Sequence, residues 1–142
     1  MGDRTWVNIT YAKADEKAVL EAFGWSKDAR RSLNTEEHDG IATAYFYEVN
    51  WGGLNEMMDL AKKGVTFTAH AGAGGSYGES LNVGYRGEFM EASAHEGEPA
   101  CLVRENGKAD REGMEHIRTY IRLARKANRE MERIQVRHKE AA

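Results

Sequence analysis

The fold is decided most clearly by residues 110–139, DREGMEHIRTYIRLARKANREMERIQVRHK. This stretch contains no proline, and its only glycine is Gly113, close to its start. Arginines recur in steps of three or four, a spacing that keeps them on one side of an α-helix. They are Arg118, Arg122, Arg125, Arg129, Arg133 and Arg137. Apolar side chains recur on the other side, at Met114, Ile117, Tyr120, Ile121, Ala124, Ala127, Met131 and Ile134. The pattern predicts one long, basic, amphipathic helix over residues 110–140.

This helix differs from the remaining chain in both reach and charge. About thirty helical residues span about 45 Å, so we expect part of the helix to extend past the rest of the fold. Residues 116–142 carry eight Lys or Arg against three Glu, a net charge of +5, whereas residues 1–115 carry a net charge of −8. Such asymmetry is typical of a helix that docks on an acidic protein surface or on nucleic acid. The alternative is a solvated helix face that has no partner.

Upstream of the helix, alternating and helical patterns predict a mixture of strands and helices. Strands are expected over residues 5–11, 41–51, 65–71, 81–92 and 100–104, and helices over residues 14–23 and 54–63. The polar residues 25–40 are expected to form a loop. The order β-α-β-α-β-β-β-α predicts an α+β fold, with a single mixed sheet of about five strands, helices packed on one face and the long C-terminal helix. A length of 142 residues favours a single domain over residues 1–142.

The strand at 41–51, the short helix at 54–63 and the strand at 65–71 form a β-α-β pattern, which predicts parallel pairing of the two strands. The helix is short, so an antiparallel arrangement also stays open. Glycines follow both strands, and open α/β sheets bind ligands beyond the carboxyl ends of parallel strands. The predicted site comprises Trp51, Gly52, Gly53, His70, Gly74, Ser76 and Tyr77. The favoured interpretation is that these glycines serve turns. In the alternative, the site would accept a small anion or a nucleotide, with an aromatic ring stacking on the base.

The sequence lacks recognised catalytic and metal-binding patterns. Residues 72–78 are rich in glycine, but Tyr77 stands where the dinucleotide fingerprint requires a glycine, and no phosphate-loop Lys-Ser/Thr follows. The five histidines do not pair with one another or with Cys101 at a metal-ligand spacing, so neither a metal nor a cofactor is expected. Cys101 lies in an apolar run and is expected to be an inert core residue rather than a nucleophile.

Targeting signals are also missing. No apolar run approaches the roughly eighteen residues of a membrane helix, and the first residues lack the apolar segment of a signal peptide. A single cysteine suits a reducing compartment. We therefore expect a cytoplasmic protein without a membrane span.

These observations favour a non-enzymatic cytoplasmic protein that binds another protein through its basic helix. The expected partner-binding residues are Arg118, Arg122, Arg125, Arg129 and Arg133. Apolar helix surface left uncovered by the sheet predicts a homodimer. A phage- or plasmid-type accessory or inhibitor protein fits this description by analogy alone. Two alternatives stay open: a ligand-binding or enzymatic site at the glycine-lined edge, and nucleic-acid binding by the arginines, against which the acidic remainder argues.

Overall fold

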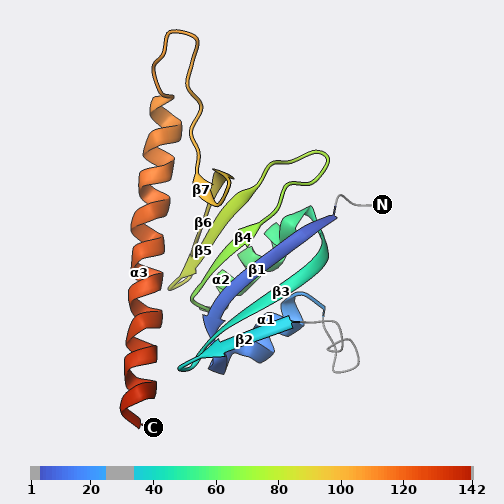
Figure 1. The fold of residues 1–142 in the computed structure, drawn as a ribbon, viewed down its shortest axis with the longest axis vertical. Coiled ribbons are helices and arrows are strands. Elements are labelled where there is room, and N and C mark those ends of the chain that lie inside the picture. The colour runs from blue at the N-terminus through green and yellow to red at the C-terminus, as the bar shows by residue number, and fades with distance from the viewer. Residues whose placement is uncertain (1–3, 25–33, 142) are drawn as a thin grey trace.

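The computed structural model describes residues 4–24 and 34–141, which form one open antiparallel sheet and three α-helices (Figure 1). The strands are β1 (Arg4–Ala12), β2 (Asn34–His38), β3 (Ile41–Asn50), β4 (Phe67–Ala71), β5 (Ser80–Tyr85), β6 (Glu88–His95) and β7 (Glu98–Pro99). The helices are α1 (Glu16–Ala22), α2 (Leu54–Lys62) and α3 (Arg111–Ala141). The α+β class and the long C-terminal helix are thus confirmed. The sheet has seven strands rather than about five, and every pair of neighbouring strands in this part of the chain is antiparallel, so the sheet is not mixed.

Strand β1 lies inside the sheet because one of its faces is strongly apolar. Val7, Ile9 and Tyr11 are fully buried, as their alternation predicts. Ile9 lies directly between Ala44 of β3 and Ala69 of β4. Helices α1 and α2 cover this face of the sheet. They contribute Val19, Leu20, Met57, Leu60 and Ala61 to the core.

The connections through α1 and α2 each pass over one strand. The strand order is β2-β3-β1-β4-β5-β6-β7, so β3 lies between β1 and β2, and β1 lies between β3 and β4. These two split β-α-β units form the β-α-β-β-α-β arrangement known as ferredoxin-like, here extended by β5, β6, β7 and α3. Strands β3 and β4 run in the same direction because both are antiparallel to β1. Their predicted direct pairing is wrong, since β1 occupies the place between them.

Helix α3 packs on the opposite face of the sheet from α1 and α2. Its residues Tyr120, Leu123 and Ala127 are buried against Val83 of β5 and Ala92 of β6. Figure 1 shows α3 along one side of the sheet, with its first turns and the preceding loop extending past the strands. The expectation of an overhanging helix therefore holds, whereas the three helices are divided between two faces rather than gathered on one.

Three segments differ from their predicted structure. Residues 34–38, expected in a loop, form the edge strand β2, and residues 25–33 of that loop lie outside the described residues. The strand predicted over residues 81–92 is a hairpin, because Arg86 and Gly87 adopt φ of 46° and 84°, as in a type I′ turn. Within residues 100–104 the pairing is limited to a bridge between Val103 and Ala109.

A helix that crosses a membrane must be both long and apolar. Of the helices in residues 4–24 and 34–141, none is both long enough and apolar enough to cross a bilayer. The longest, α3, carries arginines along most of its length.

The substitution Gly84→Ala tests how closely β4 and β5 pack. A Cβ atom at Gly84 would lie 2.4 Å from a ring carbon of Phe67 on the neighbouring strand. We expect the free energy of unfolding to fall by about 1–3 kcal/mol, as in other overpacked cores. Gly78→Ala is the matched control, because nothing lies within 4 Å of a Cβ there. Urea denaturation measures both variants, and equal stabilities would contradict this packing.

Candidate functional site

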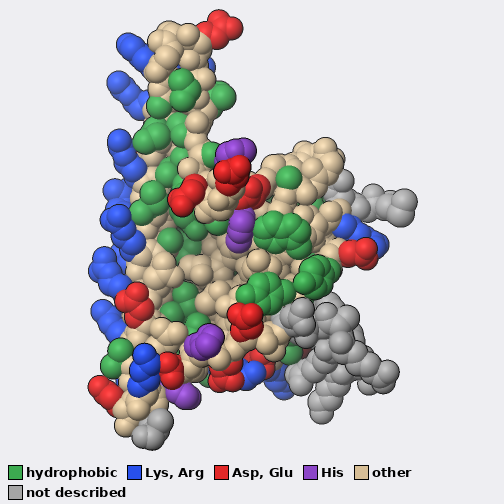
Figure 2. All heavy atoms as spheres, in the orientation of Figure 1, with side chains coloured by type: hydrophobic (Ala, Val, Ile, Leu, Met, Phe, Trp, Pro, Cys, Tyr) green, Lys and Arg blue, Asp and Glu red, His purple; other side chains and the backbone are tan. Residues whose placement is uncertain are grey.

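The outer side of α3 carries the arginines predicted to bind a partner. Arg118, Arg122, Arg125, Arg129 and Arg133 are all exposed. Figure 2 shows basic side chains gathered along the outer side of this helix. They are held there because the apolar side of α3 is packed against β5 and β6. The structure therefore brings the five residues together on one surface.

Few acidic groups accompany these arginines. Apart from the exposed pair of Arg118 and Glu115, 3.9 Å apart, no carboxylate of the described residues lies within ion-pair distance of any of the five. Arg125, Arg129 and Arg133 follow one another in steps of four. Like charges at this spacing destabilise a helix by about 0.2–0.5 kcal/mol per pair. The row thus carries repulsion that an acidic partner would relieve.

A groove beside the arginine row includes a residue that the sequence did not predict. Arg86, at the turn between β5 and β6, lines it together with Arg129, Arg133 and Arg137 of α3. The groove has a volume of about 690 Å³ and also contains the exposed Val136. The sequence does contain one signal that could have located Arg86. The Arg86-Gly87 pair interrupts an apolar stretch, which is typical of a hairpin turn.

Two glutamates modify the charge of this groove without cancelling it. Glu130 and Glu132 line it beside the four arginines. Glu130 accepts a hydrogen bond of 2.9 Å from Thr66 Oγ1, which draws its carboxylate toward the sheet. The groove therefore keeps a net positive charge.

Part of the predicted glycine-lined site is assembled at one edge of the sheet. The ring centroids of Trp51 and Tyr77 lie 5.7 Å apart. A Cβ atom at Gly52 would lie 3.6 Å from the Tyr77 ring, so the glycine is close to the aromatic pair. These residues line a pocket of about 330 Å³ together with Ser80 and Glu91. The carboxyl ends of β3 and β4 do meet at this edge, although β1 separates the two strands.

The other predicted residues near this edge have different surroundings. An added Cβ at Gly53 would lie 2.7 Å from the ring of Phe23, so this glycine permits close packing. The Gly74 amide donates a hydrogen bond of 3.0 Å to the backbone carbonyl of Tyr77. Ser76 is exposed and is not part of the pocket wall. These three residues are therefore near the pocket without lining it.

The turn that carries Trp51 has an unusual backbone. Trp51, Gly52 and Gly53 adopt φ of 54°, 65° and 73°. Glycine tolerates this left-handed region, whereas a residue with a side chain pays on the order of 1–3 kcal/mol. The Trp51 side chain is 56% exposed, so burial does not offset this cost.

His70 lies on the opposite face of the sheet from the aromatic pair, because its neighbours in β4 point into the core under α1 and α2. Its ring meets that of Trp6 edge-on, with centroids 4.8 Å apart. Its Nε2 lies 2.6 Å from the Glu79 carboxylate, which also accepts the amide hydrogens of Glu96 and Gly97 at 3.1 and 2.6 Å. The hydrogen bond with His70, followed by that from Gly97, holds the pKa of Glu79 below its usual range. Glu79 thus connects strand β4 with the turn at Glu96 and Gly97.

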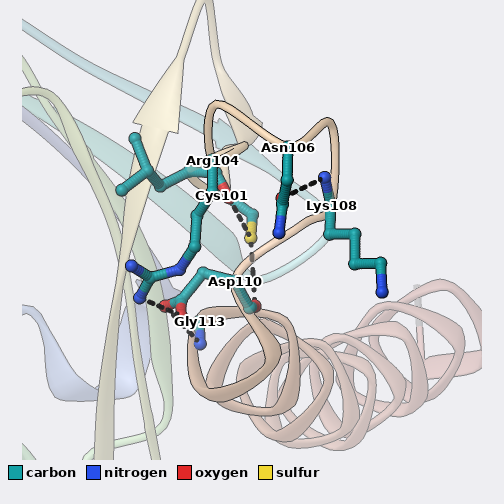
Figure 3. A network of polar contacts seen from close by, with 7 residues as sticks. Cys101, Arg104, Asn106, Lys108, Asp110 and Gly113 are labelled. Atoms are coloured by element: carbon teal, nitrogen blue, oxygen red, sulfur yellow. Dashed lines mark hydrogen bonds and ion pairs between the residues drawn. The ribbon is translucent and has the colours of Figure 1, made fainter.

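A polar network caps the N-terminus of α3 (Figure 3). Asp110 forms an ion pair of 3.0 Å with Arg104 and accepts the Gly113 amide hydrogen at 3.1 Å. The hydrogen bond from Arg104, followed by that from Gly113, lowers the pKa of the Asp110 carboxyl. The Cys101 thiol lies 3.5 Å from the backbone oxygen of Asp110. The cysteine therefore belongs to the start of α3 rather than to a strand.

Neither ligand clusters nor relatives assign an activity to these surfaces. Within the described ranges 4–24 and 34–141, no group of three or more His, Cys, Asp or Glu residues is placed to hold a metal ion. Comparisons with protein-family models, with curated proteins and with solved structures find no match for this chain. The functional argument therefore rests on the geometry and charge described above.

Acid titration tests the hydrogen bonds that the Glu79 carboxylate forms with His70, Glu96 and Gly97. The pKa of Glu79 is lower in the folded protein than in the unfolded chain, where it is about 4.3. Its ionised form therefore stabilises the fold above that value, and this contribution is lost as the pH falls through the lower folded value. We expect Glu79→Gln to reduce thermal stability at neutral pH and to lose less stability in acid than the wild type. Glu88→Gln, an exposed change on β6, should behave as the wild type. If the thermal stability of Glu79→Gln fell in acid as much as that of the wild type, these hydrogen bonds would not stabilise the fold.

Proposed function

We propose that this protein is a non-enzymatic interaction protein that binds an acidic surface of a partner protein through the basic side of α3. The observation that carries the proposal is the row of exposed arginines with a single weak ion pair among the described residues. Guanidinium groups form charge-assisted, often bidentate hydrogen bonds with carboxylates. An acidic partner would supply those carboxylates and relieve the repulsion along the row.

The residues of the groove beside Arg86 indicate the chemistry of the proposed partner. Arg129, Arg133 and Arg137 line it from α3, and Arg86 lines it from the hairpin turn. Val136, which is 54% exposed, offers an apolar contact between the charged groups. An acidic segment that carries an apolar residue among its carboxylates would match this surface.

The charge of the remaining chain favours protein over nucleic acid. Residues 1–115 carry a net charge of −8, which repels a polyphosphate wherever it extends past α3. Exposed Glu132 lies within the arginine groove itself. Carboxylates among the arginines suit a protein surface of mixed charge better than a uniform row of phosphates.

Charge reversal on α3 tests this proposal. The double variant Arg125→Glu with Arg129→Glu should lose the partner, because two guanidinium groups become carboxylates. Lys17→Glu with Lys62→Glu makes the same change in net charge at exposed positions away from α3 and should keep the partner. Partners captured from a cell lysate are identified by mass spectrometry, and binding is remeasured with the purified partner. We expect at least about a hundredfold loss of affinity for the α3 variant alone. Equal affinity of the two variants would contradict the proposal.

A second charge-reversal variant, measured at physiological salt, decides between protein and nucleic acid. At about 150 mM salt the Debye length is about 8 Å, and we expect no binding to duplex DNA or RNA. Phosphate contacts by the five arginines would give a log–log salt slope of roughly −3 to −5. Tight binding in this buffer, lost in Arg122→Glu with Arg129→Glu, would assign α3 to nucleic acid instead.

The cellular location and biological context of the protein are proposed from the sequence alone. A single cysteine suits the cytoplasm, and a charged α+β protein without catalytic motifs resembles phage- or plasmid-type accessory or inhibitor proteins as a class. Finding the captured partner among host proteins would support this setting, and finding it among secreted or surface proteins would contradict it.

We also propose a homodimer whose apolar interface is smaller than the sequence suggested. The apolar side of α3 lies largely against its own sheet. Leu102 and Val103, 68% and 61% exposed, remain available beside the start of α3. Light scattering should show a dimer that Leu102→Ser with Val103→Ser converts to a monomer, whereas Met58→Ser on α2 should not. A wild-type monomer at every concentration would rule the dimer out.

A further inference from the structure

A pocket at the carboxyl ends of β3 and β4 is separate from the arginine row. It lies on the side of the sheet that α2 covers, between the start of α2 and strands β5 and β6. Its volume of about 330 Å³ is at the small end of the range for small-molecule sites. The side chains that matter below are Trp51, Tyr77, Ser80, Glu91 and Ser93.

The backbone holds two aromatic rings at this pocket. Trp51 is kept in the left-handed region and its side chain stays 56% exposed, so core packing does not account for the turn. The turn instead orients the Trp51 ring, whose plane makes an angle of 42° with that of Tyr77. A Cβ at Gly74 would lie 2.4 Å from the Tyr77 ring, so a glycine there permits the observed ring position. Both rings are therefore in place before any ligand binds, which lowers the cost of binding.

The wall of the pocket is acidic. Its described residues include Glu91 and no lysine, arginine or histidine. Glu79 also lines it, but its carboxylate bonds His70 and the amides of Glu96 and Gly97. The N-terminus of α2 contributes about half of a positive charge, which is less than the full negative charge of Glu91 alone. Ser80 and Ser93 lie directly opposite each other on β5 and β6 and add hydroxyl groups. This balance favours a cation over the anion that the sequence suggested.

A buried amide adjoins this wall. Asn82 is fully buried and lies directly opposite Glu91 in the β5–β6 pair. Its Nδ2 donates a hydrogen bond of 3.1 Å to Ser80 Oγ, while its Oδ1 has no hydrogen-bond partner among the described residues. Buried amide oxygens seldom lack a donor. Asn82 does not itself line the pocket, and its hydrogen bond holds the Ser80 hydroxyl at the pocket wall.

We infer that this pocket binds a guanidinium group, which stacks on Trp51 and Tyr77 and donates hydrogen bonds to Glu91 and the serine hydroxyls. Guanidinium is planar, always charged at neutral pH, weakly hydrated and attracted to aromatic faces. It also matches a carboxylate through parallel N–H donors. The group can come from a free small molecule or from an arginine side chain of a peptide, and the chemistry at the pocket is the same.

Tryptophan fluorescence tests the inference on the full chain. Replacing Trp6 and Trp25 with Phe leaves Trp51 as the only tryptophan. The probe is N-acetyl-L-arginine amide, and the matched neutral probe is N-acetyl-L-citrulline amide. We expect a saturable change with the arginine compound and at least about tenfold weaker binding of the citrulline compound, because the charge supports both the ring contact and the ionic hydrogen bonds. A blocked Gly-Arg-Gly peptide distinguishes the sources: tighter binding than the amide supports a peptide ligand, and weaker binding supports a free small molecule.

A pair of variants locates the bound cation. Glu91→Gln should weaken binding by about tenfold, whereas Glu88→Gln on the same strand, outside the pocket, should not. Chemical shifts of the Trp51 indole in the wild-type protein provide a second measurement that needs no variant to fold. The inference is overturned if neither measurement saturates, if citrulline amide binds as well as arginine amide, or if Glu91→Gln binds like the wild type. It does not rest on the proposed role of α3, so Arg125→Glu with Arg129→Glu should bind the probe unchanged.

Discussion

Strand β1 presents two chemically different faces, and the fold depends on satisfying both. Ile9 is fully buried under α1 and α2, while the adjacent Thr10 points the other way and its Oγ1 lies 2.9 Å from Oγ1 of Thr43. Pairing with β3 on one side and β4 on the other provides this environment from Val7 to Tyr11. Because β3 and β4 are both antiparallel to β1, they run in the same direction and end at the same edge of the sheet. The contact between Trp51 and Tyr77 is a consequence of that arrangement.

Helix α3 completes the other side of β5 and β6, and its docking determines where the arginines point. Ala127 has no exposed surface where it meets Val83 and Ala92, and its small side chain allows the helix to approach the sheet closely. Because the arginines recur every three or four residues, one rotation of the helix about its axis places all of them. A different rotation would bury guanidinium groups without partners, at a cost far greater than the packing gained.

The two candidate surfaces have opposite charge and lie on different sides of the sheet. The row on α3 is basic, whereas Glu91 and the serine hydroxyls make the pocket beside α2 suitable for a cation. In Figure 2 the basic side chains gather along α3, while acidic side chains are spread over the body of the molecule. The proposed partner on α3 and the proposed ligand in the pocket would therefore not compete for the same surface. The separation also explains how one small chain can carry a net charge of only −3 and still present a strongly basic surface.

By itself, the sequence determined the elements whose signal is periodic and local. The helix predicted over residues 110–140 is α3 (Arg111–Ala141), its arginines share one side, and the apolar alternation of β1 is buried as expected. Only the tertiary structure decided that β1 separates β3 from β4, that Arg86 joins the arginine groove, and that His70 bonds Glu79 on the face away from Trp51. The physical reason is that a period orients side chains about their own strand or helix. It does not select the neighbour, because backbone hydrogen bonds are alike for any partner strand and the choice depends on packing between residues far apart in the chain.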